Sequence, residues 1–287
     1  MWKQNFCLST SDQFGVSEEE QIALMKKSGF DGFFCMYENG KNLVKLREYA
    51  DSIGMYFQSV HAPYVRMNKI WAEDVEGETA ANAAVEELLN CIDESARAGA
   101  PIVVMHAFIG YEHTPNQKGI ERLLAVVARA KEKNIKIAFE NTEAEEYLFA
   151  VMDAFKNEKH VGFCWDTGHE LCYNHGKNML GFFGDRLFCT HLNDNLGIRD
   201  YHGEITWIDD LHLLPFDGIA DWKDIARRLN ACGFNRELTF ELNKMNRPDR
   251  HENDIYEKMS LEEYFAEVYK RACKFATIKL KNNKLYD

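Results

Sequence analysis

The pattern that decides the fold lies in residues 135–169, which read IKIAFENTEAEEYLFAVMDAFKNEKHVGFCWDTGH. Two short apolar runs, residues 135–140 and 161–166, lie on either side of a helical pattern over residues 143–155. Both runs are almost continuously apolar, which is typical of parallel strands that are covered on both faces. A strand, a helix and a second strand make one βαβ unit, and its strands end in the carboxylates Glu140 and Asp166.

The same alternation extends along the whole chain. Apolar runs that we expect to form strands lie at residues 5–10, 32–36, 56–64, 101–108, 135–140, 161–166, 187–192 and 238–242. Helical patterns follow them at residues 17–29, 43–53, 79–98, 118–133, 143–155, 178–183, 221–233 and 261–278. Eight such units in 287 residues predict an α/β protein that is a single (β/α)8 barrel over residues 1–287. No Gly-x-Gly-x-x-Gly follows any run, so the competing doubly wound dinucleotide-binding sheet has no support.

The composition restricts the class of partner and the location. The net charge of −12 argues against a nucleic-acid partner, because phosphate binding requires Lys and Arg on the contact face. The eight cysteines contain no Cys-x-x-Cys pair and indicate reduced core residues. The first residues have no apolar signal region, and the longest uncharged stretches, residues 52–65 and 98–111, are too short to span a bilayer. We therefore expect a cytoplasmic protein without a membrane segment.

Six successive apolar runs end in a histidine or a carboxylate, and these residues are His61, His106, Glu140, Asp166, His191 and Glu241. In a barrel the carboxyl ends of the strands meet at one rim, where catalytic groups lie. Three carboxylates buried together are costly unless a cation neutralises them. The last four residues of this series therefore predict a site for one divalent metal ion. Three oxygens and one imidazole suit Mn²⁺ or Mg²⁺ and do not exclude Zn²⁺ or Co²⁺. The alternative is a salt-bridge network, which is weakened because the last four strands offer no Lys or Arg at the matching ends.

Three histidines near the same rim, His61, His106 and His169, admit several interpretations. They are candidates for donors to substrate hydroxyls, for further metal ligands, or for hydrogen-bonded interior histidines. Aromatic side chains that would suit the apolar face of a sugar ring are expected near this rim at Tyr64, Phe108, Trp165, Trp207 and Phe216.

The longest connection, residues 193–220, is expected to be an active-site loop, because long loops in compact domains are usually functional. It contains Asp210 and His212, which either form an additional metal site or shape the loop. Arg199 is the one cation of the loop and could hold an oxygen or phosphate of the substrate. A solvated loop charge is the equally ranked alternative for Arg199.

These motifs together resemble those of the xylose isomerase-like TIM-barrel superfamily, which contains sugar isomerases and epimerases, inosose dehydratases and endonuclease IV. The motifs that carry the resemblance are VHAPY at 60–64, FEN at 139–141, WDTGH at 165–169, HLND at 191–194, the segment from 210 to 222, and FE at 240–241. Resemblance to the ketose 3-epimerase branch implies a metal site of Glu140, Asp166, His191 and Glu241. It also implies that Glu140 and Glu241 are the acid/base pair and that His169 donates to a substrate oxygen. That branch has an arginine where this chain has Gly197, two residues before Arg199.

Resemblance to endonuclease IV implies a different centre, a cluster of three zinc ions. Nine residues match its ligands, namely His61, His106, Glu140, Asp166, His169, His191, Asp210, His212 and Glu241. The segment after His212 departs from that family, because Leu213, Leu214 and Pro215 stand where it has an acidic-polar run. Basic residues near the rim are also sparse for a DNA-binding enzyme.

The function we expect is that of a metal-dependent isomerase or epimerase of a small sugar, sugar phosphate or polyol. One glutamate would remove a proton from carbon, an enediolate would form, and the other glutamate would return the proton. The alternatives are an endonuclease IV-like zinc phosphodiesterase, an inosose dehydratase-like lyase and a non-catalytic sugar-binding barrel. A homo-oligomer is compatible with the sequence.

Overall fold

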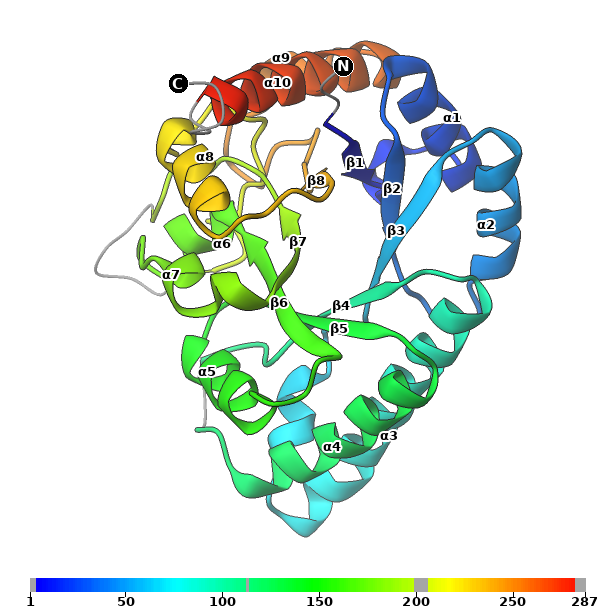
Figure 1. Cartoon of the computed structure of the whole chain (residues 1–287), viewed down its shortest axis with the longest axis vertical. Helices are drawn as coiled ribbons and strands as arrows, with labels where there is room; N and C mark the ends of the chain where they lie inside the picture. Colours follow the sequence, from blue (N-terminus) through cyan, green and yellow to red (C-terminus); the bar gives the residue numbers. More distant parts are fainter. Residues whose placement is uncertain (1–3, 112–113, 199–205, 282–287) are drawn as a thin grey trace.

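The computed structural model describes residues 4–111, 114–198 and 206–281, in which parallel strands form a ring surrounded by helices (Figure 1). The strands are β1 (Phe6–Ser9), β2 (Gly32–Met36), β3 (Tyr56–His61), β4 (Ile102–His106), β5 (Lys136–Glu140), β6 (Val161–Asp166), β7 (Leu187–His191) and β8 (Leu238–Phe240). Their order is β7-β6-β5-β4-β3-β2-β1-β8, and each neighbouring pair is parallel. The predicted single (β/α)8 barrel is confirmed.

The ring closes between β7 and β8 through few contacts. A parallel bridge pairs Leu192 with Phe240, just past the end of β7. The amide of Leu192 donates to the carbonyl of Thr239 at 2.8 Å. The amide of Thr239 donates in turn to Oγ1 of Thr190 at 3.2 Å. Only a few hydrogen bonds close the ring within the described residues, but they bring Glu241, the residue after β8, beside the end of β7.

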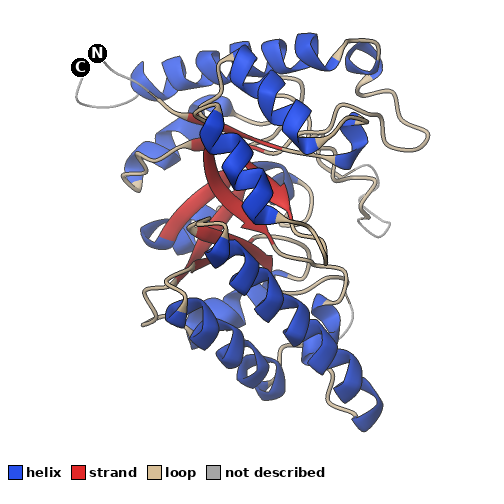
Figure 2. Ribbon diagram, turned by 90° about the vertical axis from the view of Figure 1, so that its right-hand side faces the viewer, coloured by secondary structure: helices blue, strands red, loops and turns tan. Residues whose placement is uncertain are grey.

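The helices cover the outer face of this ring (Figure 2). They are α1 (Glu18–Ser28), α2 (Leu43–Ser52), α3 (Val75–Arg97), α4 (Gln117–Glu132), α5 (Glu145–Ala154), α6 (Thr167–Leu171), α7 (Met179–Phe183), α8 (Trp222–Ala231), α9 (Asp254–Glu257) and α10 (Leu261–Lys281). Ser17 caps α1 by accepting from the amide of Glu20, and Gly29 ends it with φ 111°. Within the described ranges, no helix combines the length and the apolar character needed to cross a bilayer.

The side chains that point into the ring determine where the candidate site lies. Side chains alternate between the two faces of a strand, so residues two apart share a face. A small buried cluster inside the ring contains Val104, Ala138, Cys164 and Cys189, together with Ile102. The next position on the same face of each of these four strands is His106, Glu140, Asp166 or His191 respectively. The inward rows that are apolar at the middle of the barrel therefore become polar at its carboxyl end.

Candidate metal centre

Four side chains from the ends of β5, β6, β7 and β8 meet at the carboxyl end of the barrel. Strand register sets Asp166 opposite His191. One potential ligand atom from each of Glu140, Asp166, His191 and Glu241 lies within 4.8 Å of those of the other three. Glu140, Asp166 and His191 are buried, and Glu241 is partly buried. The structure thus brings together the four residues for which the sequence predicts a metal site.

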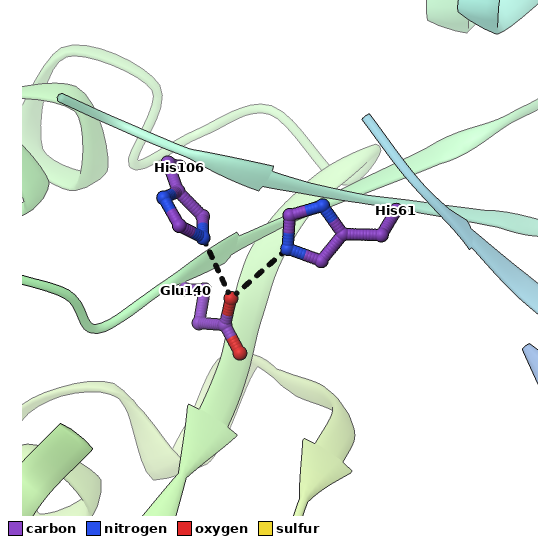
Figure 3. Close-up of side chains that lie close together, drawn as sticks. All are labelled: His61, His106 and Glu140. Atoms are coloured by element: carbon purple, nitrogen blue, oxygen red, sulfur yellow. Dashed lines mark hydrogen bonds and ion pairs between the residues drawn. The ribbon is translucent and has the colours of Figure 1, made fainter. Parts of the chain in front are cut away.

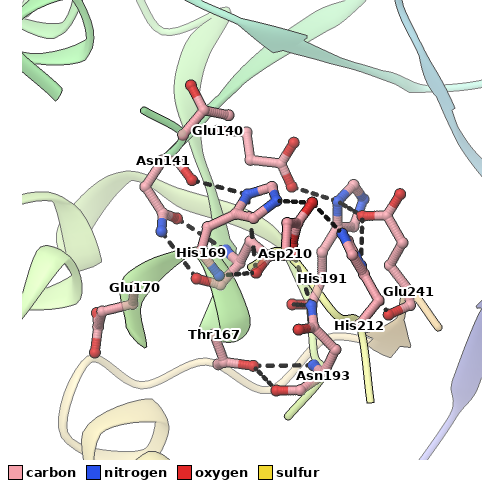
Figure 4. A network of polar contacts seen from close by, with 12 residues as sticks. Glu140, Asn141, Thr167, His169, Glu170, His191, Asn193, Asp210, His212 and Glu241 are labelled. Carbon is pink, nitrogen blue, oxygen red and sulfur yellow. Dashed lines mark hydrogen bonds and ion pairs between the residues drawn. The ribbon is translucent and has the colours of Figure 1, made fainter. Parts of the chain in front are cut away.

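His191 lies between two carboxylates (Figure 4). Its Nδ1 is 2.5 Å from Oε1 of Glu140 and 2.9 Å from Oε2 of Glu241. Burial alone would lower the pKa of His191, but the two carboxylates outweigh it and raise that pKa well above its usual value. Burial alone would raise the pKa of Glu241, but His191 outweighs this effect and lowers the pKa of Glu241 to about 2. The carboxylates are thus held ionised and favour positive charge between them.

A second group of possible metal ligands consists of His61, His106 and the other carboxylate oxygen of Glu140 (Figure 3). Oε2 of Glu140 is 3.3 Å from Nε2 of His61 and 3.2 Å from Nε2 of His106. Nδ1 of His61 is 2.8 Å from the carbonyl of Ala62, which can only accept, so this nitrogen carries the proton. Burial lowers the pKa of His106, against the opposing effect of Glu140. His61 and His106, which the sequence left between substrate donors, metal ligands and interior histidines, therefore form a possible ligand group with Glu140.

The third group comes from α6 and the long loop (Figure 4). Oδ2 of Asp210 is 3.4 Å from Nε2 of His169 and 3.0 Å from Nε2 of His212. Burial would raise the pKa of Asp210, but His212 and His169 hold it well below its usual value. Burial alone would lower the pKa of His212, but Asp210 outweighs this effect and raises the pKa of His212 to about 9. Asp210 and His212, which the sequence left between a metal site and a loop role, thus have a geometry that suits a metal site.

Two asparagines that the sequence analysis did not assign hold Asp166 in place. Nδ2 of Asn193 donates to Oδ2 of Asp166 at 2.7 Å, and Nδ2 of Asn141 donates to its backbone carbonyl at 2.8 Å. Oδ1 of Asp166 accepts from the amide of His169 at 2.7 Å and caps α6. Burial raises the pKa of Asp166 to about 6, although His169 and His212 act to lower it. Their positions in the sequence could have identified the two asparagines, because Asn141 follows the last residue of β5 and Asn193 lies two residues after β7.

The chemistry of these groups fits divalent metal ions. Carboxylate oxygens and imidazole nitrogens are the usual ligands of Zn²⁺, Mn²⁺ and Co²⁺. Among the described residues, three buried polar atoms of these groups have no hydrogen-bond partner, namely Oδ1 of Asp210, Nδ1 of His106 and Nε2 of His191. An ionised carboxylate oxygen that is buried without a partner is costly, and a bound cation would remove that cost. The three groups fit a metal, and its identity and number stay predictions.

A cavity of about 1040 Å³ opens above the three groups. Of the nine possible ligands, the seven that line it are His61, His106, Glu140, His169, Asp210, His212 and Glu241. Of the five aromatic residues expected near the rim, Tyr64 and Trp207 line the cavity. Phe108 and Trp165 are instead buried in the hydrophobic core, and Phe216 packs against Trp222. Arg199, the predicted substrate-binding cation, lies outside the described residues.

Sequence comparisons place the chain among known proteins. A family model described as "Xylose isomerase-like TIM barrel" matches residues 22–261. A relative in Sinorhizobium fredii (strain NBRC 101917 / NGR234), called uncharacterized protein y4fM, is 35% identical over 210 residues, or 66% of this chain and 64% of the relative. A probable endonuclease 4 of Methanocorpusculum labreanum (strain ATCC 43576 / DSM 4855 / Z) is 29% identical over 129 residues, or 37% of this chain and 46% of the relative. The chain thus aligns with less than two thirds of the length of either relative.

Solved structures with the same barrel extend the comparison. The crystal structure of the IOLI protein with a binding zinc atom aligns with a TM-score of 0.69 and 18% identity, over 98% of this chain and 99% of that chain. The structure of L-ribulose 3-epimerase aligns with a TM-score of 0.66 and 14% identity, over 96% of this chain and 98% of that chain. At these identities the likeness establishes the shared fold.

Proposed function

The chain belongs to the family of xylose isomerase-like TIM barrels, which confirms the resemblance seen in the sequence, and we propose that it is a metal-dependent sugar isomerase or epimerase. The observation that carries the proposal is the pair of ionised carboxylates, Glu140 and Glu241, on either side of His191 at the floor of the cavity. Two carboxylates that face one bound substrate can remove a proton from carbon and return it. The epimerase among the structural neighbours supports this choice.

The proposed metal ligands are Glu140, Asp166, His191 and Glu241. A divalent ion bound there would supply Lewis-acid polarisation of a carbonyl oxygen and a template for an adjacent hydroxyl. Glu241 lines the cavity and is ionised because His191 lowers its pKa, so it is available as the base. Glu140 also lines the cavity and is the partner that returns a proton to the carbon. Glu140 takes this proton from solvent, and Glu241 releases to solvent the proton that it has removed, so both carboxylates end the cycle ionised.

His169 is the proposed donor to a substrate oxygen. Its Nδ1 is 3.0 Å from the carbonyl of Asn141, which fixes the orientation of the ring. Burial would lower the pKa of His169, but Asp166 and Asp210 raise it well above its usual value. A protonated ring that is held in this way at the cavity wall can donate a hydrogen bond to a sugar oxygen.

The charge of the cavity favours a small molecule over DNA. Its described lining contains eight carboxylates, Asp12, Glu18, Glu38, Glu87, Glu140, Glu143, Asp210 and Glu241, against three Lys or Arg cations, Lys41, Arg66 and Arg247. DNA binding requires the opposite balance, because each phosphate contact needs a cation.

The test is solvent-deuterium incorporation into a panel of ketoses, aldoses and inososes with the Mn²⁺-supplemented protein. We expect exchange at the carbon next to the carbonyl group of one of these sugars. Glu140→Gln and Glu241→Gln should each lower the exchange rate by about 10²–10⁴-fold, because each removes one proton-transferring group. Glu146→Gln, on the exposed face of α5, is the control. Full activity in both cavity variants would refute the assignment.

A second candidate is a zinc phosphodiesterase, and the arrangement of the three ligand groups is the observation that favours it. Two groups share Glu140, and the third, His169, Asp210 and His212, lies beside them (Figure 4). Elemental analysis of the purified protein, together with an assay of cleavage at abasic sites in DNA, separates the candidates. Three zinc ions per chain with cleavage would favour the phosphodiesterase, whereas one ion with sugar exchange would favour the isomerase.

A further inference from the structure

The cavity is larger than a single sugar ring requires. Pockets that bury drug-sized ligands measure about 300–1,000 Å³, and this cavity, at about 1040 Å³, lies just above that range. A monosaccharide is much smaller than such a ligand. With a sugar over the ligand groups on the floor, the outer part of the cavity is left for a second portion of the substrate.

Each Lys or Arg that lines the cavity within the described residues already has an acceptor or a carboxylate nearby. Nζ of Lys41 is 2.8 Å from Oε1 of Glu18 and 2.7 Å from the carbonyl of Met36. Nε of Arg247 donates to the carbonyl of Asp210 at 2.8 Å.

The third cation of the wall, Arg66, lies 3.8 Å from Oε1 of Glu87. A phosphate would have to displace these partners and lie beside an excess of carboxylates, which disfavours it. The wall therefore disfavours a phosphorylated substrate.

Aromatic side chains provide the apolar surface of this outer part. Trp207 and Tyr111 line the cavity, and 56% and 51% of their surfaces respectively are exposed. The guanidinium of Arg247 lies 5.4 Å from the centre of the Trp207 ring, and Arg247 is itself anchored on Asp210. Such a cation–π contact holds the tryptophan ring in position before a ligand arrives. Deeper in the cavity, the ring of Tyr64 stacks on that of His106 at 4.8 Å.

We infer that the substrate is an uncharged glycoside that carries a carbonyl group on the sugar unit over the ligand groups, and whose second ring lies against Trp207. The inference rests on the proposed function, since it assigns the floor of the cavity to the reacting sugar. The second ring is an aromatic group or a second sugar, because both present an apolar face to an aromatic side chain.

The experiment measures the affinity of the Mn²⁺-supplemented protein for matched ligands by calorimetry. The ligands are the methyl glycosides, 4-nitrophenyl glycosides and 6-phosphates of D-glucose, D-galactose and D-mannose, together with the disaccharides cellobiose and lactose. We expect at least one series in which the 4-nitrophenyl glycoside or the disaccharide binds about tenfold more tightly than the methyl glycoside. Tighter binding of the 4-nitrophenyl glycoside would identify the second ring as aromatic, and tighter binding of the disaccharide would identify it as a sugar.

Trp207→Ala should reduce that preference to less than about threefold, because the ring that contacts the second group is lost. Phe182→Ala, which removes a similarly exposed aromatic ring on α7, should keep it. Tighter binding of a phosphate, equal binding of all neutral ligands, or a preference that survives in Trp207→Ala would overturn the inference. Deuterium exchange is measured in parallel with cellobiose, lactose and the free sugars of the panel above, because methyl and 4-nitrophenyl glycosides have no carbonyl group and cannot exchange. Ring-dependent binding without exchange in any of these carbonyl-bearing sugars would reject the proposed reaction and retain the glycoside site.

Discussion

Glu140 is the residue on which the site depends most. Its Oε1 faces His191, whereas its Oε2 faces both His61 and His106, so one carboxylate connects two ligand groups. The sequence predicted that Glu140 would meet His191, because both end strands whose carboxyl ends meet at one rim of the barrel. It could not predict that His61 and His106 would converge on the second oxygen, since that depends on side-chain rotamers and on strand register.

Gly168 shows how tightly the residues behind the site are packed. A Cβ built on Gly168 would overlap the Oδ1 atom of Asn193, whose Nδ2 holds Asp166. We therefore expect Gly168→Ala to lower the free energy of unfolding by about 1–3 kcal/mol, through overpacking. It should also weaken metal binding, because displacement of Asn193 releases Asp166. Urea denaturation and metal titration check both effects, with Gly184→Ala, at a looser site near Cys232, as the control. Unchanged stability would mean that the asparagine moves at no cost.

Glu158 gives a pH-dependent prediction away from the site. It accepts from the amide of His160 at 3.2 Å and lies 3.2 Å from Nζ of Lys131. The backbone and side-chain contacts of His160, aided by Lys131, lower the pKa of Glu158 to about 2. A lowered pKa stabilises the folded protein above the unfolded value near pH 4.3, and this contribution is lost as the pH falls towards 2.

Glu158→Gln should therefore lower the free energy of unfolding by about 1 kcal/mol at pH 7, a value reduced for partial exposure. The difference from the unmodified protein should narrow below pH 4.5. Urea denaturation between pH 7 and pH 3.5 measures it. Asp153→Asn, which removes an exposed carboxylate of α5, is the control. A constant difference across this range would exclude the assigned role of the carboxylate.

At the scale of elements, the segment after β8 holds the loop that carries the third ligand group. The amide of Asn243 donates to the carbonyl of His212 at 2.9 Å. Arg250 donates to the carbonyl of Ile208 at 3.3 Å and lies 3.6 Å from Oδ1 of Asp209. Together with the contact of Arg247 to Asp210, these bonds connect two segments that are far apart in sequence.

We expect Arg250→Ala to weaken metal binding by the third group by about tenfold, because the loop loses two contacts and with them the position of Asp210. The site of Glu140, Asp166, His191 and Glu241 should be much less affected. Chelator competition followed by elemental analysis measures both. Arg227→Ala, which removes an exposed arginine of α8, is the control. Identical metal retention in Arg250→Ala and the control would show that the loop holds its shape unaided.

The elements were predictable where the periodicity was strong. All eight strands fall within the predicted runs, and the capped helix after Ser17 ends at Gly29 as expected. The short helix α6 was missed, because it follows β6 without a connecting loop and its cap, Asp166, is itself a candidate ligand. The hydrogen bonds of Arg247 and Arg250 to the long loop were also not predictable, since they reach backbone carbonyls that any sequence would offer.

At the scale of the whole molecule, closure of the barrel is what completes the candidate site. Glu241 follows β8 and His191 ends β7, so the two meet only because β7 and β8, the strands at the two ends of the eight-stranded sheet, come together. The seam between them is short, and Thr190 spans it by exchanging two hydrogen bonds with the backbone of Thr239. A residue that binds nothing in the cavity thereby controls the distance between two possible ligands.

Thr190→Val keeps the shape of this side chain and removes both hydrogen bonds. We expect a loss of about 1–3 kcal/mol in the free energy of unfolding, because the buried amide of Thr239 loses its partner, whereas the carbonyl of Thr239 keeps the amide of Leu192. The amides of Leu192 and Glu241, which bond across the seam, should exchange with solvent faster than those between β4 and β5. Metal affinity should fall as well, since seam opening moves Glu241 away from His191. Thr277→Val, on the exposed side of α10, is the matched control. Slow exchange at the seam in Thr190→Val would mean that the strand ladder and core packing close the barrel without the threonine.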